Sequence, residues 1–269
     1  MDLTTIGGII LGFASLIVAF VMEGGSPLAL LGLSAAIIVF GGTAGAVIIS
    51  FSAKQLKMVG SLFSIAFKQQ KLDSLAAIEQ LVALATSARR EGILSLEDKL
   101  EGMQDVFFKN AVQLVVDGVD PELVRSILET EIGYMEARHE AGVAVFESAG
   151  GFAPTMGIIG TVTGLIHVLS NLTNVSTLGP LIATAFIATL YGVGSANLLW
   201  LPLASKLKQR SKEEILLREI MVEGVLSIQA GENPTVLDQK LKVFLAPRMR
   251  DRSQGKKGSA SSESEVANA

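Results

Sequence analysis

The stretch Gly150–Leu169, GGFAPTMGIIGTVTGLIHVL, combines the apolar character of a membrane-spanning helix with residues that weaken helices. It contains no Asp, Glu, Lys or Arg, and its length matches the ~20 residues that a helix needs to cross ~30 Å of hydrocarbon. Pro154 has no backbone N–H to donate and distorts a helix. In lipid, the carbonyl that loses its donor needs a partner from a neighbouring helix or from water in a cavity. The stretch therefore predicts a spanning helix that is packed inside protein or lines a path.

Three other windows have the same apolar character, and the whole chain of 269 residues has a mean hydropathy of +0.49. They are Thr4–Met22, Leu28–Phe51 and Pro180–Leu203. The first window is expected to be a retained helix rather than a cleaved signal peptide, because it lacks a basic start and a second window follows closely. The absence of cysteine excludes disulfides and thiolate metal sites. These windows predict an all-α membrane protein with four spans.

The positive charges predict how these spans are oriented. Every Lys and Arg lies either between Lys54 and Arg138 or between Lys206 and Lys257, and the short connections 23–27 and 170–179 have none. Lys and Arg are enriched on the cytoplasmic side of membranes. Both basic segments, and with them both chain termini, are therefore expected in the cytoplasm.

The chain divides on this basis into five segments. Residues 1–51 hold spans one and two, 52–148 a helical cytoplasmic domain, 149–205 spans three and four, 206–249 further cytoplasmic helices, and 250–269 a polar tail expected to be disordered. In 52–148, apolar residues recur at three- and four-residue steps, which indicates amphipathic helices. Asp120 and Pro121 form a helix-start signal, and the helix that they begin is expected to continue into span three.

Small residues and hydroxyls in spans three and four have two interpretations. Gly160 with Gly164, and Ala188 with Gly192, form small-xxx-small pairs that let helices approach closely. Such packing alone explains them, and the alternative is a narrow ion path. A cation path normally needs an acidic side chain within the membrane, but no Asp or Glu occurs between residues 148 and 209. A conducting assembly must therefore take its carboxylate from a second polypeptide.

Four motifs show a resemblance to the MotA-type stator subunits of the bacterial flagellar motor, within the MotA/ExbB/TolQ superfamily. They are FAPTMGIIGT at residues 152–161, ATLYGVGSANLLWLP at 188–202, ARREGILSLE at 88–97 and REIMVEGVLSIQAGENP at 218–234. The resemblance covers roughly residues 1–247. It implies a homopentameric ring in the inner membrane around MotB-type single-span subunits that supply the ion-binding aspartate. Ion flow would turn the ring against the rotor protein FliG.

The resemblance also implies roles for individual residues. Its ion-pathway and coupling positions are Pro154, Thr155, Thr161, Thr189 and Pro202. Its rotor-facing charges are Arg89, Arg90 and Glu97, which would otherwise be read as ordinary solvated charges.

The driving ion and two other functions stay open. Sodium-type relatives tend to carry hydroxyls at the positions of Thr161, Ala188 and Thr189, so the alanine here favours protons and leaves sodium as an alternative. An ExbB/TolQ-type energiser usually has three spans, and a non-conducting scaffold would use the same small-residue packing. No nucleotide loop, metal-ligand spacing or catalytic set is found, so neither an enzyme, nor a cofactor, nor a nucleic-acid partner is expected.

Overall fold

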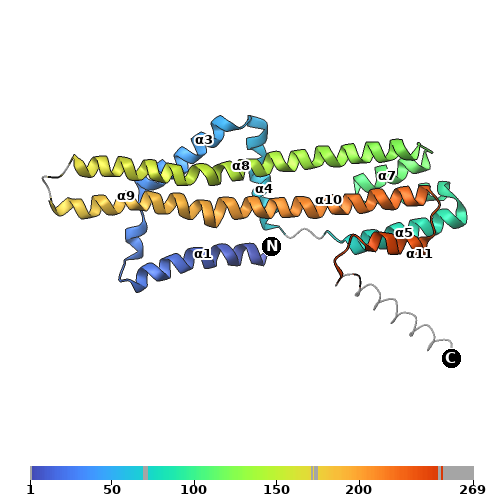
Figure 1. The fold of residues 1–269 in the computed structure, drawn as a ribbon, viewed down its shortest axis with the longest axis horizontal. Coiled ribbons are helices and arrows are strands. Elements are labelled where there is room, and N and C mark those ends of the chain that lie inside the picture. Colours follow the sequence, from blue (N-terminus) through green and yellow to red (C-terminus); the bar gives the residue numbers. More distant parts are fainter. Residues whose placement is uncertain (1, 69–71, 171, 173–174, 248–249, 251–269) are drawn as a thin grey trace, which may run out of the picture. The chain divides into compact units, whose positions relative to one another are not determined.

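The computed structural model describes residues 2–68, 72–170, 172, 175–247 and 250, and this part of the chain is helical without any strand (Figure 1). The first half contains α1 (Leu3–Met22), the 3₁₀ turn η1 (Pro27–Leu30), α2 (Leu33–Ala36), the π turn η2 (Ile37–Gly41), α3 (Gly42–Ser50), α4 (Ala53–Phe67), α5 (Ser74–Glu91), the 3₁₀ turn η3 (Ile93–Leu96), α6 (Glu97–Leu100) and α7 (Val106–Val116). The second half contains α8 (Pro121–Leu169), α9 (Val175–Ser195), the π turn η4 (Ala196–Trp200), α10 (Leu201–Gln229) and α11 (Pro234–Lys242). The all-α prediction is confirmed.

Four helical stretches of the described residues are long and apolar enough to cross a membrane, as the sequence predicts. They are Leu3–Met22, Pro27–Ser50, Pro121–Leu169 and Leu178–Gln229. The last two are longer than a single span, since α8 begins well before the apolar window and α10 continues beyond it. The predicted continuity of the Asp120 helix into span three is therefore confirmed, and Asp120 caps it through Glu122 N–H at 3.0 Å.

The chain separates into two compact units. The span unit contains Met1–Gln70 and Ala137–Arg210, and the second unit contains Lys71–Glu136 and Ser211–Ala269. The long helices α8 and α10 contribute residues to both. The predicted tail 250–269 lies, apart from residue 250, outside the described residues.

The span unit is held together by several small contact clusters. Ala35 and Val39 pack on Ala188 of α9, and an aromatic cluster joins Phe63, Phe146 and Trp200, with ring centroids 5.0–6.4 Å apart. α1 has no buried residue, and many of its large apolar side chains are exposed. Exposed apolar side chains on a helix of this length are those that a bilayer would cover.

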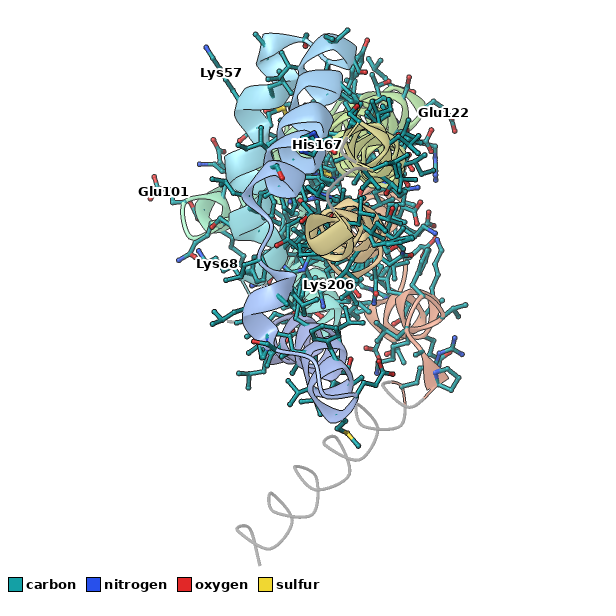
Figure 2. The ribbon with its side chains drawn as sticks, turned by 90° about the vertical axis from the view of Figure 1, so that its left-hand side faces the viewer. Lys57, Lys68, Glu101, Glu122, His167 and Lys206 are labelled. Carbon is teal, nitrogen blue, oxygen red and sulfur yellow. The ribbon has the colours of Figure 1, made fainter. Side chains whose placement is uncertain are left out.

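The second unit has one continuous hydrophobic core. It is built from α5, η3, α7, α11 and the parts of α8 and α10 in this unit, with Ile78, Leu81, Leu96, Leu237 and Leu241 fully buried. Aspartates at the helix starts satisfy free backbone N–H groups: Asp73 caps α5 and Asp105 caps α7. Exposed side chains such as Glu101 and, on α4 of the span unit, Lys57 extend away from the ribbon (Figure 2).

Candidate functional site: the α8–α9 wall and the α5–α6 turn

Within the span unit, α8 and α9 lie side by side and approach each other through small residues (Figure 1). A Cβ added to Gly160 would lie 2.5 Å from Ala188 Cβ, and one added to Gly164 would lie 2.6 Å from Ala185 Cβ. These contacts confirm the close helix approach predicted for this pair. The glycines leave no room for a side chain between the two backbones.

The tightest crossing of these two helices is at Gly157 and Gly192, and Gly157 was not predicted from sequence. A Cβ on Gly157 would lie 2.8 Å from the carbonyl oxygen of Ala188, and one on Gly192 would lie 2.5 Å from that of Ala153. Gly157 precedes Gly164 by seven residues and so lies on the same helix face. That spacing is the signal that would have identified it.

Thr161 and Thr189 meet at this crossing. Their hydroxyl oxygens are hydrogen-bonded to each other, and the Thr161 hydroxyl is also 3.1 Å from the carbonyl oxygens of Gly157 and Ala185. Both side chains are only partly buried. The structure therefore brings the two predicted hydroxyl positions to one place, where oxygen atoms gather between two apolar helices.

Pro154 lies inside the unbroken helix α8. It has no N–H for the carbonyl oxygen of Gly150, one turn earlier. Ile158 and Leu165, on the same helix face, are 57% and 39% exposed on the single chain. Pro154 itself is partly buried, and it belongs to an apolar stripe that its own chain covers only in part.

The other two predicted pathway residues lie apart from the threonine pair. Thr155 is exposed and donates its hydroxyl to the carbonyl oxygen of Phe152 at 2.7 Å. Pro202 is exposed and follows the π turn Ala196–Trp200, where the wider turn accommodates the proline ring. Pro202 lines a groove against α1 rather than the Thr161–Thr189 crossing.

Tyr191 is a second residue that sequence reasoning missed. Its hydroxyl donates to the carbonyl oxygen of Leu30 at 2.6 Å and accepts the N–H of Gly32 at 3.1 Å. These bonds tie α9 to the start of span two, where the chain leaves the 3₁₀ turn. The sequence shows that Tyr191 lies in a motif next to Gly192, but it does not show which backbone groups the Tyr191 hydroxyl contacts.

The predicted rotor-facing charges lie around one turn of the second unit. Arg89 and Arg90 are in the last turn of α5, and Glu97 begins α6. Between them, Gly92 has φ +90°, which favours glycine, and the 3₁₀ turn η3 is anchored by the fully buried Leu96. All three charged side chains are exposed, and none has an ion-pair partner among the residues that the structure describes.

This turn also presents an apolar side chain. Leu94 is 72% exposed, between Arg90 and Glu97 in sequence. Lys99 donates to the Ser87 hydroxyl and so ties α6 to α5. The turn therefore presents exposed charges of both signs together with an exposed apolar residue.

Two ion pairs lie elsewhere in the second unit. Arg218 donates to both carboxylate oxygens of Asp105 at 2.6 Å and lies over the Phe107 ring. Burial opposes ionisation of Asp105, but the Arg218 hydrogen bond and charge outweigh it and lower the carboxyl pKa. Lys240, 2.6 Å from Glu223, lowers the pKa of that carboxyl, and Glu223 in turn raises the pKa of Lys240.

The part of the chain that the structure describes has no group of three or more His, Asp or Glu side chains that could hold a metal ion. The α8–α9 wall supplies hydroxyls, carbonyls and apolar surface, but no carboxylate.

Comparison with known proteins places this geometry in a family. Residues 6–92 match the family model described as Motility protein A N-terminal, and residues 99–220 match that of the MotA/TolQ/ExbB proton channel family. Motility protein A of Bacillus subtilis is 44% identical over 254 residues, which cover 93% of each chain. Chemotaxis protein PomA of Vibrio alginolyticus is 38% identical, over 91% of this chain and 96% of its own.

Solved structures agree with the sequence comparison. A chain of C. jejuni MotAB superposes with a TM-score of 0.88 at 32% identity, covering 92% of this chain and 97% of its own. A chain of the flagellar MotAB stator complex from Bacillus subtilis gives a TM-score of 0.87 at 43% identity, covering 93% and 98%. The chain therefore belongs to the motility protein A family, within the MotA/TolQ/ExbB proton channel family.

Proposed function

We propose that this protein is the larger stator subunit of a bacterial flagellar motor and forms a cation channel with a MotB-type single-span partner. The observation that carries the proposal is the α8–α9 wall, in which Thr161 and Thr189 meet in a membrane segment that has no acidic residue. A cation path needs an acidic site within the hydrocarbon. The MotB-type partner supplies that site as an aspartate.

The apolar stripe at Pro154, Ile158 and Leu165 supports a ring around that partner. Ile158 and Leu165 are exposed and Pro154 is partly buried on the single chain, so this helix face keeps apolar surface that the chain itself does not cover. In a closed homopentamer this stripe faces the central partner helices. An assembly of this kind also explains why a wall with no charge of its own is rich in glycine and threonine.

The charge distribution supports the orientation in the inner membrane. Lys and Arg lie only on one side of the four spans, so both termini and the second unit are in the cytoplasm. There the exposed charges Arg89, Arg90 and Glu97 contact the rotor protein FliG. Exposed charges of this kind steer an interface and fix its register more than they hold a fold.

Protons are the favoured driving ion. Ala188 is buried against Gly160 and its side chain supplies no oxygen, which leaves Thr161 and Thr189 as the side-chain oxygens at this level of the wall. A bare Na⁺ needs several oxygen ligands, whereas a proton needs one carboxylate and a chain of water. Swimming speed measured at fixed pH should therefore be independent of sodium concentration, and a strong dependence would favour sodium.

The match of the first two spans favours the stator over an ExbB/TolQ-type energiser, because residues 6–92 match the Motility protein A N-terminal family. No enzymatic step and no cofactor is assigned, and the transported ion is cargo. The test is complementation of a strain that lacks its stator genes, with this chain and its partner expressed together. Restored rotation supports the proposal. Co-assembly with the partner but no rotation in any driving ion would contradict it.

A further inference from the structure

A groove separates α1 from the π turn η4 and the start of α10 within the span unit. It has a volume of about 360 Å³ and is lined by Gly8, Ile9, Leu198, Leu199, Pro202 and Lys206, among others. That volume lies within the ~300–1,000 Å³ of small-ligand sites. Apolar side chains form most of its wall, and the Lys206 ammonium lies at one end (Lys206 is labelled in Figure 2).

The groove exists because α1 is attached at two levels and unsupported between them. At the deep level, Gly12 contacts Leu198: a Cβ there would lie 2.8 Å from Leu198 Cδ2. At the charged end, Asp2 is 2.6 Å from Lys206 Nζ, and its N–H donates to the carbonyl oxygen of Phe67 at 2.9 Å. Between these levels a Cβ on Gly8 would meet nothing within 4 Å.

The dimensions of the groove match one leaflet of a bilayer. Asp2 caps α1 and marks the membrane surface, and Gly12 lies ten residues further, or about 15 Å along a helix. Half of a ~30 Å hydrocarbon layer has the same thickness. The groove therefore runs from the level of the lipid headgroups toward the middle of the membrane, which is the course of an acyl chain.

The charges at the mouth favour an anion. Arg210 Nη2 lies 3.2 Å from the same Asp2 oxygen that pairs with Lys206, so two cations share one carboxylate. The Lys206 hydrogen bond holds the pKa of Asp2 well below its usual range, so this carboxylate stays ionised and one positive charge remains in excess. Basic pockets between membrane helices bind anionic lipid headgroups.

Arg210 does not line the groove, and its Nη1 donates to the carbonyl oxygens of Ile65 and Lys68, so Lys206 is the cation available to a ligand. We propose that this groove, here called the α1 groove, binds one anionic phospholipid, with its phosphate at Lys206 and an acyl chain along Gly8 and Leu198. The inference does not depend on the stator function. Only the identity of the leaflet, cytoplasmic, follows from the orientation proposed above.

The first test varies the charge at the mouth. Native mass spectrometry of the full-length protein, purified in mild detergent with phosphatidylglycerol or phosphatidylcholine of equal chain length, reports the lipid retained per chain. Wild type should prefer phosphatidylglycerol, and Lys206→Gln should weaken its retention about fivefold, as expected for one charge near the surface. Lys208→Gln, whose lysine pairs with the exposed Glu147, should leave it unchanged.

Asp2→Asn separates lipid binding from a purely structural ion pair. Asparagine caps a helix as well as aspartate does, and the substitution leaves Lys206 and Arg210 uncompensated. Phosphatidylglycerol retention should therefore rise about fivefold. If Asp2→Asn instead lowers retention in parallel with Lys206→Gln, the three charges only hold α1 in place and the proposal is wrong.

The second test fills the groove without changing any charge. Gly7 and Gly8 both have open space at Cβ, but only Gly8 lines the groove. Gly8→Leu should abolish retention of phosphatidylglycerol, and Gly7→Leu should retain it at the wild-type level. A different result would overturn the proposal: wild type forms oligomers without bound lipid, and Gly8→Leu does not. That result would show that a neighbouring copy of the chain occupies the groove.

Discussion

Two roles are possible for Pro154, helix packing or the coupling of ion passage to motion, and they predict opposite effects of the same substitution. Pro154→Ala restores a backbone N–H that can donate to the Gly150 carbonyl, and it removes the clash of the proline ring. In an unadapted helix interior these changes raise helix stability by about 3 kcal/mol. If Pro154 only packs, the variant is harmless. If it lets the wall flex as the partner's aspartate changes occupancy, the stiffened helix loses function.

We expect Pro154→Ala to insert and assemble normally but to lose most torque, measured by tethered-cell or bead rotation at low and high load. Pro180→Ala is the matched control, because that proline also lies inside a span helix and is exposed far along α9 from the crossing. If Pro154→Ala produces torque at the wild-type level, Pro154 has no role in coupling and serves only in helix packing.

Gly157 tests the α8–α9 crossing itself. An added Cβ would lie 2.8 Å from the Ala188 carbonyl oxygen and 3.2 Å from Thr189 Cα, both backbone atoms that cannot rotate away. Gly157→Ala should therefore destabilise the protein by about 1–3 kcal/mol, seen as a lower melting temperature in detergent.

Gly151 offers the control for this change, since it lies on the same helix and a Cβ there meets nothing within 4 Å. Gly151→Ala should be neutral or stabilising by up to about 1 kcal/mol, because alanine is the better helix former. Equal melting temperatures for both variants would show that the crossing is looser than described.

The turn from α5 to α6 is the surface that we propose contacts the rotor. Arg89→Glu should reduce torque while leaving stator assembly intact, because the side chain is exposed and has no ion-pair partner among the described residues. A compensating charge reversal on FliG should restore part of the rotation. Lys109→Glu, an exposed lysine on α7, is the control. If the Arg89→Glu variant is no longer found in the membrane, Arg89 is needed for folding or insertion, and its assignment to the rotor contact is wrong.

The pairing of α7 with α10 through Asp105 and Arg218 makes the second unit sensitive to acid. Because Arg218 lowers the pKa of Asp105 in the folded protein, the unfolded chain binds the proton more tightly. The stabilisation is thus complete above the ordinary carboxyl pKa of about 4 and is lost as the pH falls through the lower folded value.

Hydrogen exchange of the α7 amides, corrected for the intrinsic rate, should show protection falling below about pH 4. Asp105→Asn should remove that dependence and lower protection at neutral pH. Asp98→Asn, at an exposed carboxylate, should change neither. An Asp105→Asn profile identical to wild type would mean that the ion pair does not stabilise this unit.

These elements also show which features of the fold can be predicted from the sequence and which cannot. Apolar windows and caps are local signals, so the four spans and the Asp120 start were predictable. The contacts of Gly160 and Gly164 followed from small-residue spacing. Gly157 was missed although its seven-residue spacing from Gly164 was visible in the sequence. Tyr191 was missed because its role depends on which residues of another segment lie opposite. The π turns at Ile37–Gly41 and Ala196–Trp200 were missed because no local propensity marks them.

For the whole molecule, we propose that the parts of the ion path are divided between two polypeptides. This chain supplies a wall of hydroxyls, glycines and proline, and the MotB-type partner would supply the charge. The helices of the wall cross at Gly157 and Gly192, and no acidic residue occurs between residues 148 and 209. On this proposal, a ring of such chains does not conduct until the partner's aspartate lies inside it.

Proton flux into vesicles that contain the purified complex tests this division most directly. The account predicts flux when this chain and its activated MotB-type partner are both present. It predicts background flux for this chain alone and for the complex whose partner carries Asn in place of its intramembrane Asp. Flux from this chain alone, or undiminished flux with the Asn partner, would contradict the claim that the conducting carboxylate comes from outside this chain.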